Sequence, residues 1–171
     1  MAEGGIVCTP VSTSEVTPPG DADPVVVTLV EDADGHERTV RGAQVKSFRL
    51  GKGQGPNVTT TRAGTGFVAT SVRAGFPMAS RAVSAPERVY AIATLAAPAG
   101  SRWCDHNLDT GQILFYGPEV QHTAVNPVGV HFSFAAMDRY ALRQSAEGMG
   151  LTPNLPGPGQ IRAIPTTDSH A

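Results

Sequence analysis

Residues 103–126 read WCDHNLDTGQILFYGPEVQHTAVN and contain two short apolar segments on either side of a tight turn. Residues 112–116 have the apolar and aromatic content of a strand, Gly117 and Pro118 are turn-forming residues, and the following segment carries His122. This pattern predicts a β-hairpin. Because side chains alternate along a strand and both alternating sets in residues 112–116 are apolar, we expect this strand to be buried on both faces.

Similar short segments recur along the chain at spacings near ten residues. The clearest is residues 25–30, VVVTLV, which is followed by an acidic turn at residues 31–35. Glycine and proline residues separate most segments from the next. Many short strands of this kind predict a mainly β fold, either a sandwich or a barrel. The other strand candidates are residues 38–50, 57–62, 66–73, 79–84, 88–95, 121–125 and 129–134.

One helical pattern stands out, at residues 136–148, where apolar and small residues recur at spacings of three and four and glycines follow. Its repeating positions are Met137, Tyr140 or Ala141, Gln144 or Ser145, and Met149. Residues 1–24 lack such periodicity, so we expect a flexible arm there. The prolines and glycines of residues 151–171 predict an extended linker, within which residues 166–169 have the N-cap composition of another helix start.

The composition argues against several classes of protein. A chain of 171 residues fits one domain, and 13 basic against 15 acidic residues disfavour direct nucleic-acid binding. Two cysteines, Cys8 and Cys104, are too few for a disulfide scaffold or a cysteine zinc site, and we interpret both as free thiols. The N-terminus lacks the features of a signal peptide, and nothing approaches the ~20 apolar residues of a membrane span. We therefore expect a cytoplasmic protein that does not bind membranes.

The spacing of four features around residue 117 resembles a known motif. Gly111 is followed by five residues, then by Gly-Pro-Glu at 117–119, and then by His122 and Asn126. This resembles the second conserved motif of the cupin superfamily and implies a cupin-like double-stranded β-helix. In cupin enzymes this histidine is one of several metal ligands, together with an upstream His-x-His and a glutamate. Residues 75–100 contain no histidine, so we expect neither a metal nor another cofactor.

Several motifs follow one another in a fixed order between residues 45 and 150. They are FRLG at 48–51, GFP at 75–77, the segment 103–110, GQILFYGP at 111–118, the apolar strand 130–134 and a helix that ends in Gly-x-Gly. Their order and spacing resemble the N-terminal sensor and dimerisation domain of AraC-family transcription regulators, in the group that contains the ethanolamine-utilisation regulator. In that family a linker and two helix-turn-helix units follow, and residues 151–171 have room for the linker alone. The resemblance implies a module without its own DNA-binding domain, either a fragment or a partner of an intact regulator.

This interpretation divides the chain into an arm (1–24), a cupin-like sensor domain (25–150) and a linker (151–171). Aromatic residues are concentrated between positions 103 and 134, and a ligand site in a β-barrel needs aromatic walls with a few polar groups. The predicted site for a small-molecule effector consists of Trp103, Tyr116, His122 and His131. The predicted interface of a homodimer, or of a heterodimer with an intact regulator, consists of Met137, Tyr140, Ala141 and Gln144.

Two other functions remain open from the sequence. One is a stand-alone cupin-fold enzyme, an isomerase or metal-dependent oxygenase. The other is a structural partner that pairs with another chain and binds no small molecule. We do not interpret Cys104 and His106 as a catalytic pair, because adjacency alone does not place a base beside a thiol. The glycine-rich residues 51–55 lack the ending of a phosphate-binding loop and predict a turn between strands.

Overall fold

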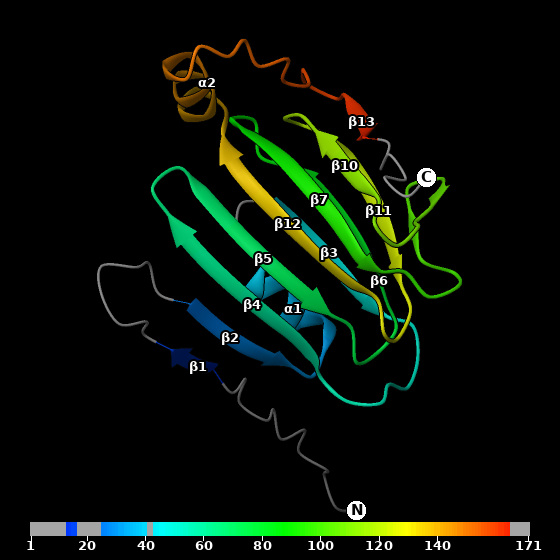
Figure 1. Cartoon of the computed structure of the whole chain (residues 1–171). Coiled ribbons are helices and arrows are strands. Elements are labelled where there is room, and N and C mark those ends of the chain that lie inside the picture. Colours follow the sequence, from blue (N-terminus) through cyan, green and yellow to red (C-terminus); the bar gives the residue numbers. More distant parts are fainter. Residues whose placement is uncertain (1–12, 17–24, 41–42, 165–171) are drawn as a thin grey trace, which may run out of the picture.

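The computed structural model describes residues 13–16, 25–40 and 43–164, which form two antiparallel sheets and two short helices (Figure 1). The predicted mainly β fold is confirmed. The larger sheet has the strand order β1 (Thr13–Val16), β2 (Val25–Val30), β4 (Asn57–Gly64), β5 (Phe67–Arg73), β12 (His131–Asp138), β7 (Arg88–Ala96), β10 (Ile113–Tyr116) and β13 (Ile161–Ile164). The smaller sheet has the order β3 (Ala43–Arg49), β6 (Met78–Ser84), β11 (Gln121–Asn126), β8 (Arg102–Trp103) and β9 (His106–Asn107). The helices are α1 (Ala33–Thr39) and α2 (Arg139–Gly148).

From β5 to β12 the chain alternates between the two sheets, with the β8–β9 hairpin counted as one unit. Strands β5, β7, β10 and β12 belong to the larger sheet, whereas β6, β8, β9 and β11 belong to the smaller one. Strand β12 returns to pair with both β5 and β7, and β11 pairs with both β6 and β8. This connectivity is that of a double-sheet jelly roll, in which the inner faces of two sheets pack on each other.

The core lies between these inner faces, and it follows from the two-residue period of the strands. Alternate residues of β5, beginning at Val68, are buried, and the residues between them are more exposed. Strand β11 shows the same alternation, with His122 and Ala124 buried. The turns predicted at glycine and proline separate the strands as expected, and most strand bounds agree within a few residues.

The predicted hairpin at Gly117 is wrong, because the strands on its two sides lie in different sheets. Strand β10 pairs with β7 and β13, whereas β11 pairs with β6 and β8. Ser84 holds the crossing segment in place, since its hydroxyl donates to the carbonyl of Gly117 (3.0 Å) and accepts from the N–H of Val120 (2.8 Å). Along β10, Leu114 and Tyr116 are buried while the alternate residues are half-buried, so burial is complete on one face only.

The acidic segment predicted as a turn at residues 31–35 instead begins helix α1. The Asp32 side chain accepts a hydrogen bond from the N–H of Gly35, which satisfies a backbone donor of the first turn. The helix contacts β3 and, to a smaller extent, β2, so it lies across the gap between the two sheets at this edge (Figure 1).

Helix α2 begins later than predicted. Strand β12 continues to Asp138, where it still pairs with β7, and the Asp138 carboxylate then caps the helix by accepting from the N–H of Ala141 (2.8 Å). Ala136 and Met137 therefore lie in the strand, because pairing on both sides outweighs their helical spacing. After α2 the chain runs back to the edge of β10 (Figure 1).

The terminal segments are more structured than predicted. Residues 13–16 of the expected arm form β1, which pairs with β2, and residues 161–164 of the expected linker form β13. The rest of the arm, Cys8 and residues 166–169 lie outside the described residues. Within the described part, no helix has the length and apolar character needed to cross a membrane.

Candidate functional site

A cavity of about 60 Å³ lies between the two sheets. At roughly 10–15 Å³ for each water molecule, this volume corresponds to about four to six waters. The larger sheet contributes Tyr90, Ile92, Tyr116, Phe132 and Phe134, the smaller sheet contributes Ala43, Val45, Ser80, Ala82, Trp103, His122, Ala124 and Asn126, and Leu108, His36 and Val40 complete the wall. A concave, mainly apolar site with a few polar groups is typical of small-molecule binding.

Four aromatic rings on this wall form one cluster that connects the sheets. Tyr90 and Tyr116 stack in parallel with 4.8 Å between ring centroids, and Trp103 stacks on His122 at 4.0 Å. Tyr116 joins the two pairs, since its ring centroid lies 5.6 Å from that of Trp103 and 5.4 Å from that of His122. The structure therefore brings together three of the four residues proposed for the effector site.

His131, the fourth proposed residue, does not line the cavity. Its Nε2 hydrogen-bonds the hydroxyl of Ser71 at 3.0 Å, and Ser71 alternates with the buried residues of β5. Phe132 and Phe134 face the cavity instead. Because side chains alternate along a strand, His131 lies on the other face from these two phenylalanines and apart from the other three residues of the predicted site.

His122 is buried and lies on β11, with 8% of its surface exposed. Burial lowers its pKa from 6.5 to about 4, because desolvation disfavours the charged ring, and the backbone of Val120 opposes this only in part. The imidazole is therefore neutral at pH 7. The His122 ring has a backbone hydrogen bond with Val120, whereas the buried indole Nε1 of Trp103 makes no hydrogen bond to the residues that the structure describes.

His36 is a cavity residue that the sequence analysis missed. It lies on α1, is 4% exposed, and has a buried Nδ1 without a partner. Burial lowers its pKa to about 4, against a smaller opposing effect of the Glu37 carboxylate. Three features of the sequence were signals of a helix here, namely Asp32 at the N-cap, Asp34 in the first turn and Arg38 in the last turn. No feature of the sequence indicated that His36 would lie at the cavity.

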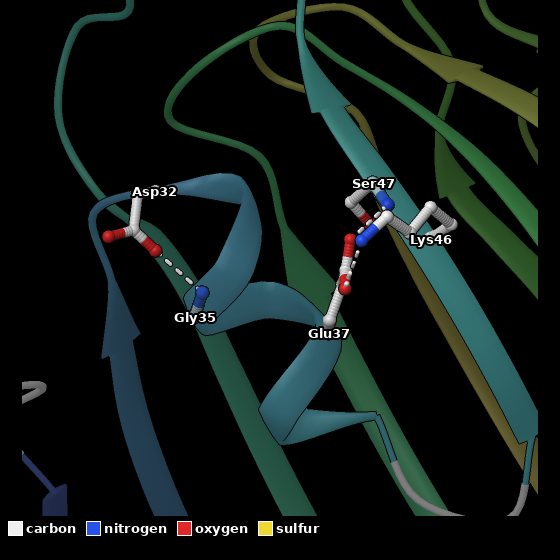
Figure 2. A network of polar contacts seen from close by, with 5 residues as sticks. All are labelled: Asp32, Gly35, Glu37, Lys46 and Ser47. Atoms are coloured by element: carbon white, nitrogen blue, oxygen red, sulfur yellow. Dashed lines mark hydrogen bonds and ion pairs between the residues drawn. The ribbon is translucent and has the colours of Figure 1, made fainter.

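Glu37 fixes α1 against the edge of the smaller sheet. Its carboxylate accepts a hydrogen bond from the N–H of Ser47 on β3 (2.6 Å), and its other oxygen lies 3.6 Å from the ammonium of Lys46 (Figure 2). Strand β3 is the edge strand of that sheet, so its outer backbone groups have no strand to pair with. The Glu37 carboxylate of α1 provides the missing acceptor for the N–H of Ser47. His36, the preceding residue, is thereby held at the end of the cavity.

The described residues of the cavity wall include no aspartate, glutamate, lysine or arginine. Burial raises the pKa of Tyr116 well above its usual range and raises that of Tyr90, so both phenols stay neutral at pH 7.

The residues proposed for dimerisation are divided between two elements. Tyr140, Ala141 and Gln144 lie on α2, where Tyr140 is 70% exposed and accepts a hydrogen bond from Nε2 of Gln144 (2.9 Å). Met137 lies in β12 and is not part of the helix surface.

Neither a metal cluster nor a thiol–imidazole pair is formed by the residues that the structure describes. No three histidine, cysteine, aspartate or glutamate side chains in this part of the chain are grouped so that they could hold a metal ion. Cys104 has a positive φ of 51° in the tight turn between β8 and β9, so it does not continue a strand toward His106.

Comparisons with protein-family models, with curated proteins and with solved structures gave no match. The interpretation of the site therefore depends on its own geometry.

Proposed function

We propose that this chain is the effector-binding module of an AraC-type transcription regulator that acts in the cytoplasm. The observation that carries the proposal is the cavity between the two sheets, whose wall is mainly aromatic and apolar and includes two buried histidines, His36 and His122. The jelly-roll connectivity agrees with the cupin-like resemblance of the sequence.

A ligand in this cavity would act by favouring one arrangement of the elements around it. It would touch α1 through His36 and β10 through Tyr116. Strand β13, which follows α2 and the proline-rich segment, pairs with β10 along its length. The segment that would lead toward a DNA-binding partner is therefore attached to a strand of the cavity wall.

The alternative of a stand-alone enzyme has less support. A general acid or base that works near pH 7 needs a pKa near that value. The titratable side chains of the wall are His36, His122, Tyr90 and Tyr116, and burial moves the pKa of each away from neutrality. These shifts favour binding over proton transfer.

Pairing with a second regulator subunit remains part of the proposal. The exposed ring of Tyr140 on α2 supports this face as the contact, whereas Met137 no longer belongs to it. The net charge of −2 supports a role in which a partner chain, and not this one, contacts DNA.

The experiment that tests ligand binding compares the wild-type chain with an Ala124→Leu variant. Ala124 is buried on the cavity wall, so leucine should fill the space, while Ala63→Leu adds the same atoms on an exposed position of β4. A library of compounds with up to about six non-hydrogen atoms is screened by ligand-observed NMR. Compounds that bind the wild type and Ala63→Leu but not Ala124→Leu would support the proposal. If no compound showed this pattern, the cavity would not be the effector site.

A further inference from the structure

We propose that the outer face of the smaller sheet binds an acidic segment of a partner protein. Apolar side chains of that segment would lie along a row formed by Phe48, Ala79 and Val125. Its carboxylates would lie beside Arg81 and Arg102. This inference goes beyond the proposed function, because the face lies on the side of the sheet away from the cavity.

The outer face follows from the alternation of side chains along the strands. Ala82 on β6 and Ala124 on β11 line the cavity, so the residues next to them in sequence point to the opposite face. Arg81 and Thr123 lie opposite each other on these two inner strands of the sheet, and both are exposed. The middle of this face is therefore open to solvent.

An apolar row crosses three strands of this face. The register places Phe48 of β3 opposite Ala79 of β6, and Ala79 opposite Val125 of β11. The ring of Phe48 is 55% exposed, and the other two side chains are half-buried. Covering such a row with the apolar side chains of a partner is favourable, because it removes apolar surface from water.

The smaller sheet also concentrates positive charge. Its five strands contain four basic residues and no aspartate or glutamate, although the whole chain has 15 acidic against 13 basic residues. These four are Lys46, Arg49, Arg81 and Arg102. An excess of one sign on a single sheet favours a partner of the opposite sign.

Two of these cations are opposite each other, and they differ in their partners. Lys46 of β3 pairs directly with Arg81 of β6, and like charges in such a position repel. The ammonium of Lys46 has the Glu37 carboxylate at 3.6 Å (Figure 2). Among the described residues, neither Arg81 nor Arg102 has an ion-pair partner. Carboxylates of another chain would supply these partners.

The positions of the two arginines fit an extended peptide. Arg102 of β8 lies opposite Val125, at the end of the apolar row, so it is two strands and two residues away from Arg81. These steps are about 10 Å across the strands and about 7 Å along them, which gives about 12 Å between the two positions. Acidic residues four positions apart in an extended peptide are about 13 Å apart, with an apolar residue between them on the same side.

A peptide fits this face better than a nucleic acid does. A nucleic acid carries a charge on every phosphate and is bound through many cations, whereas the chain as a whole has a net charge of −2. A segment that combines a few carboxylates with apolar side chains matches both the two arginines and the apolar row.

The test selects peptides of about 12 residues, long enough to span the face when extended, from a random phage-displayed library. The full wild-type chain at pH 7 and low salt is the bait, and the double variant Arg81→Gln, Arg102→Gln is used for counter-selection. We expect the enriched peptides to have a net negative charge and at least one large apolar side chain.

The affinity of an enriched peptide is then measured by fluorescence anisotropy. Arg81→Gln and Arg102→Gln should each weaken binding about twofold to fivefold, as is typical of exposed ion pairs. Phe48→Ser should weaken it about tenfold through lost apolar contact. Arg62→Gln is the matched control, since it removes the same charge from an exposed position of β4 in the larger sheet. Amide spectra that match the wild type show that each variant is folded.

Three kinds of result would overturn the inference. The first is a selection that enriches no peptide, or that enriches peptides without an acidic excess. The second is equal weakening by Arg62→Gln, or tighter binding of an oligothymidylate that depends on Arg81 and Arg102, which would assign the face to nucleic acid. The third is a wild type that is dimeric by light scattering and a double variant that is monomeric, which would assign the face to a second copy of the chain.

Discussion

Lowering the pH from 8 to 5 should destabilise this fold by about 4 kcal/mol through His36 and His122 alone. Both side chains have a pKa of about 4 in the folded chain and an ordinary value of 6.5. The unfolded chain therefore takes up protons first as the pH falls, so stability is full above pH 6.5 and decreases down to about pH 4. At pH 5 each histidine accounts for about 2 kcal/mol of this loss.

The assay is urea unfolding followed by the fluorescence of Trp103, the single tryptophan of the chain, which is buried. The free energy of unfolding is measured at pH 8 and pH 5 for the wild type, His36→Gln, His122→Phe and the double variant. The free energy of unfolding at pH 8 exceeds that at pH 5, and each substitution should reduce this excess by about 2 kcal/mol, whatever it does to absolute stability. His106→Gln changes an exposed histidine and serves as the control. A double variant as sensitive to pH as the wild type would refute this reasoning.

Three further predictions concern packing and assembly. Ser84→Ala should cost about 1–3 kcal/mol in urea unfolding, because it leaves a buried N–H of the β10–β11 crossing without its acceptor; a loss under 0.5 kcal/mol would contradict this. Gly75→Ala should lower stability by about 1–3 kcal/mol or more, since its Cβ would lie 2.1 Å from the carbonyl oxygen of Pro56, whereas Gly55→Ala, with nothing within 4 Å, should not. If α2 pairs two chains, Tyr140→Ser should shift the mass measured by light scattering from dimer to monomer; a monomeric wild type at ~100 μM, far above a micromolar dissociation constant, would rule this pairing out.

The strands were predictable because their signals are local. Residues 25–30 and 67–73, for example, combine β-forming residues with turn residues at their ends, and both are strands. The pairing of strands was not predictable in the same way. The turn at Gly117 looks like that of a hairpin, yet the hydrogen bonds of Ser84, distant in sequence, hold it as a crossing between sheets.

The candidate site was partly predictable for the same reason. Trp103, Tyr116 and His122 were found because aromatic residues cluster in one segment, and the structure brings them into one ring cluster. His36 was missed since its contribution depends on a short helix that contacts both sheets and lies 67 to 86 residues before Trp103, Tyr116 and His122 in the sequence. His131 lies apart from these three residues, because clustering in the sequence does not tell which face of a strand reaches the interior.

Because of helix α1, the pairing of the strands and the shape of one end of the cavity depend on different residues. The strands must keep their register to fold, whereas the end of the cavity is formed by a seven-residue helix held through its cap and through Glu37. Substitutions at His36 or Val40 would change the shape of the cavity without altering any strand pair. A library of variants at these two positions would therefore vary the cavity while the two sheets keep their register.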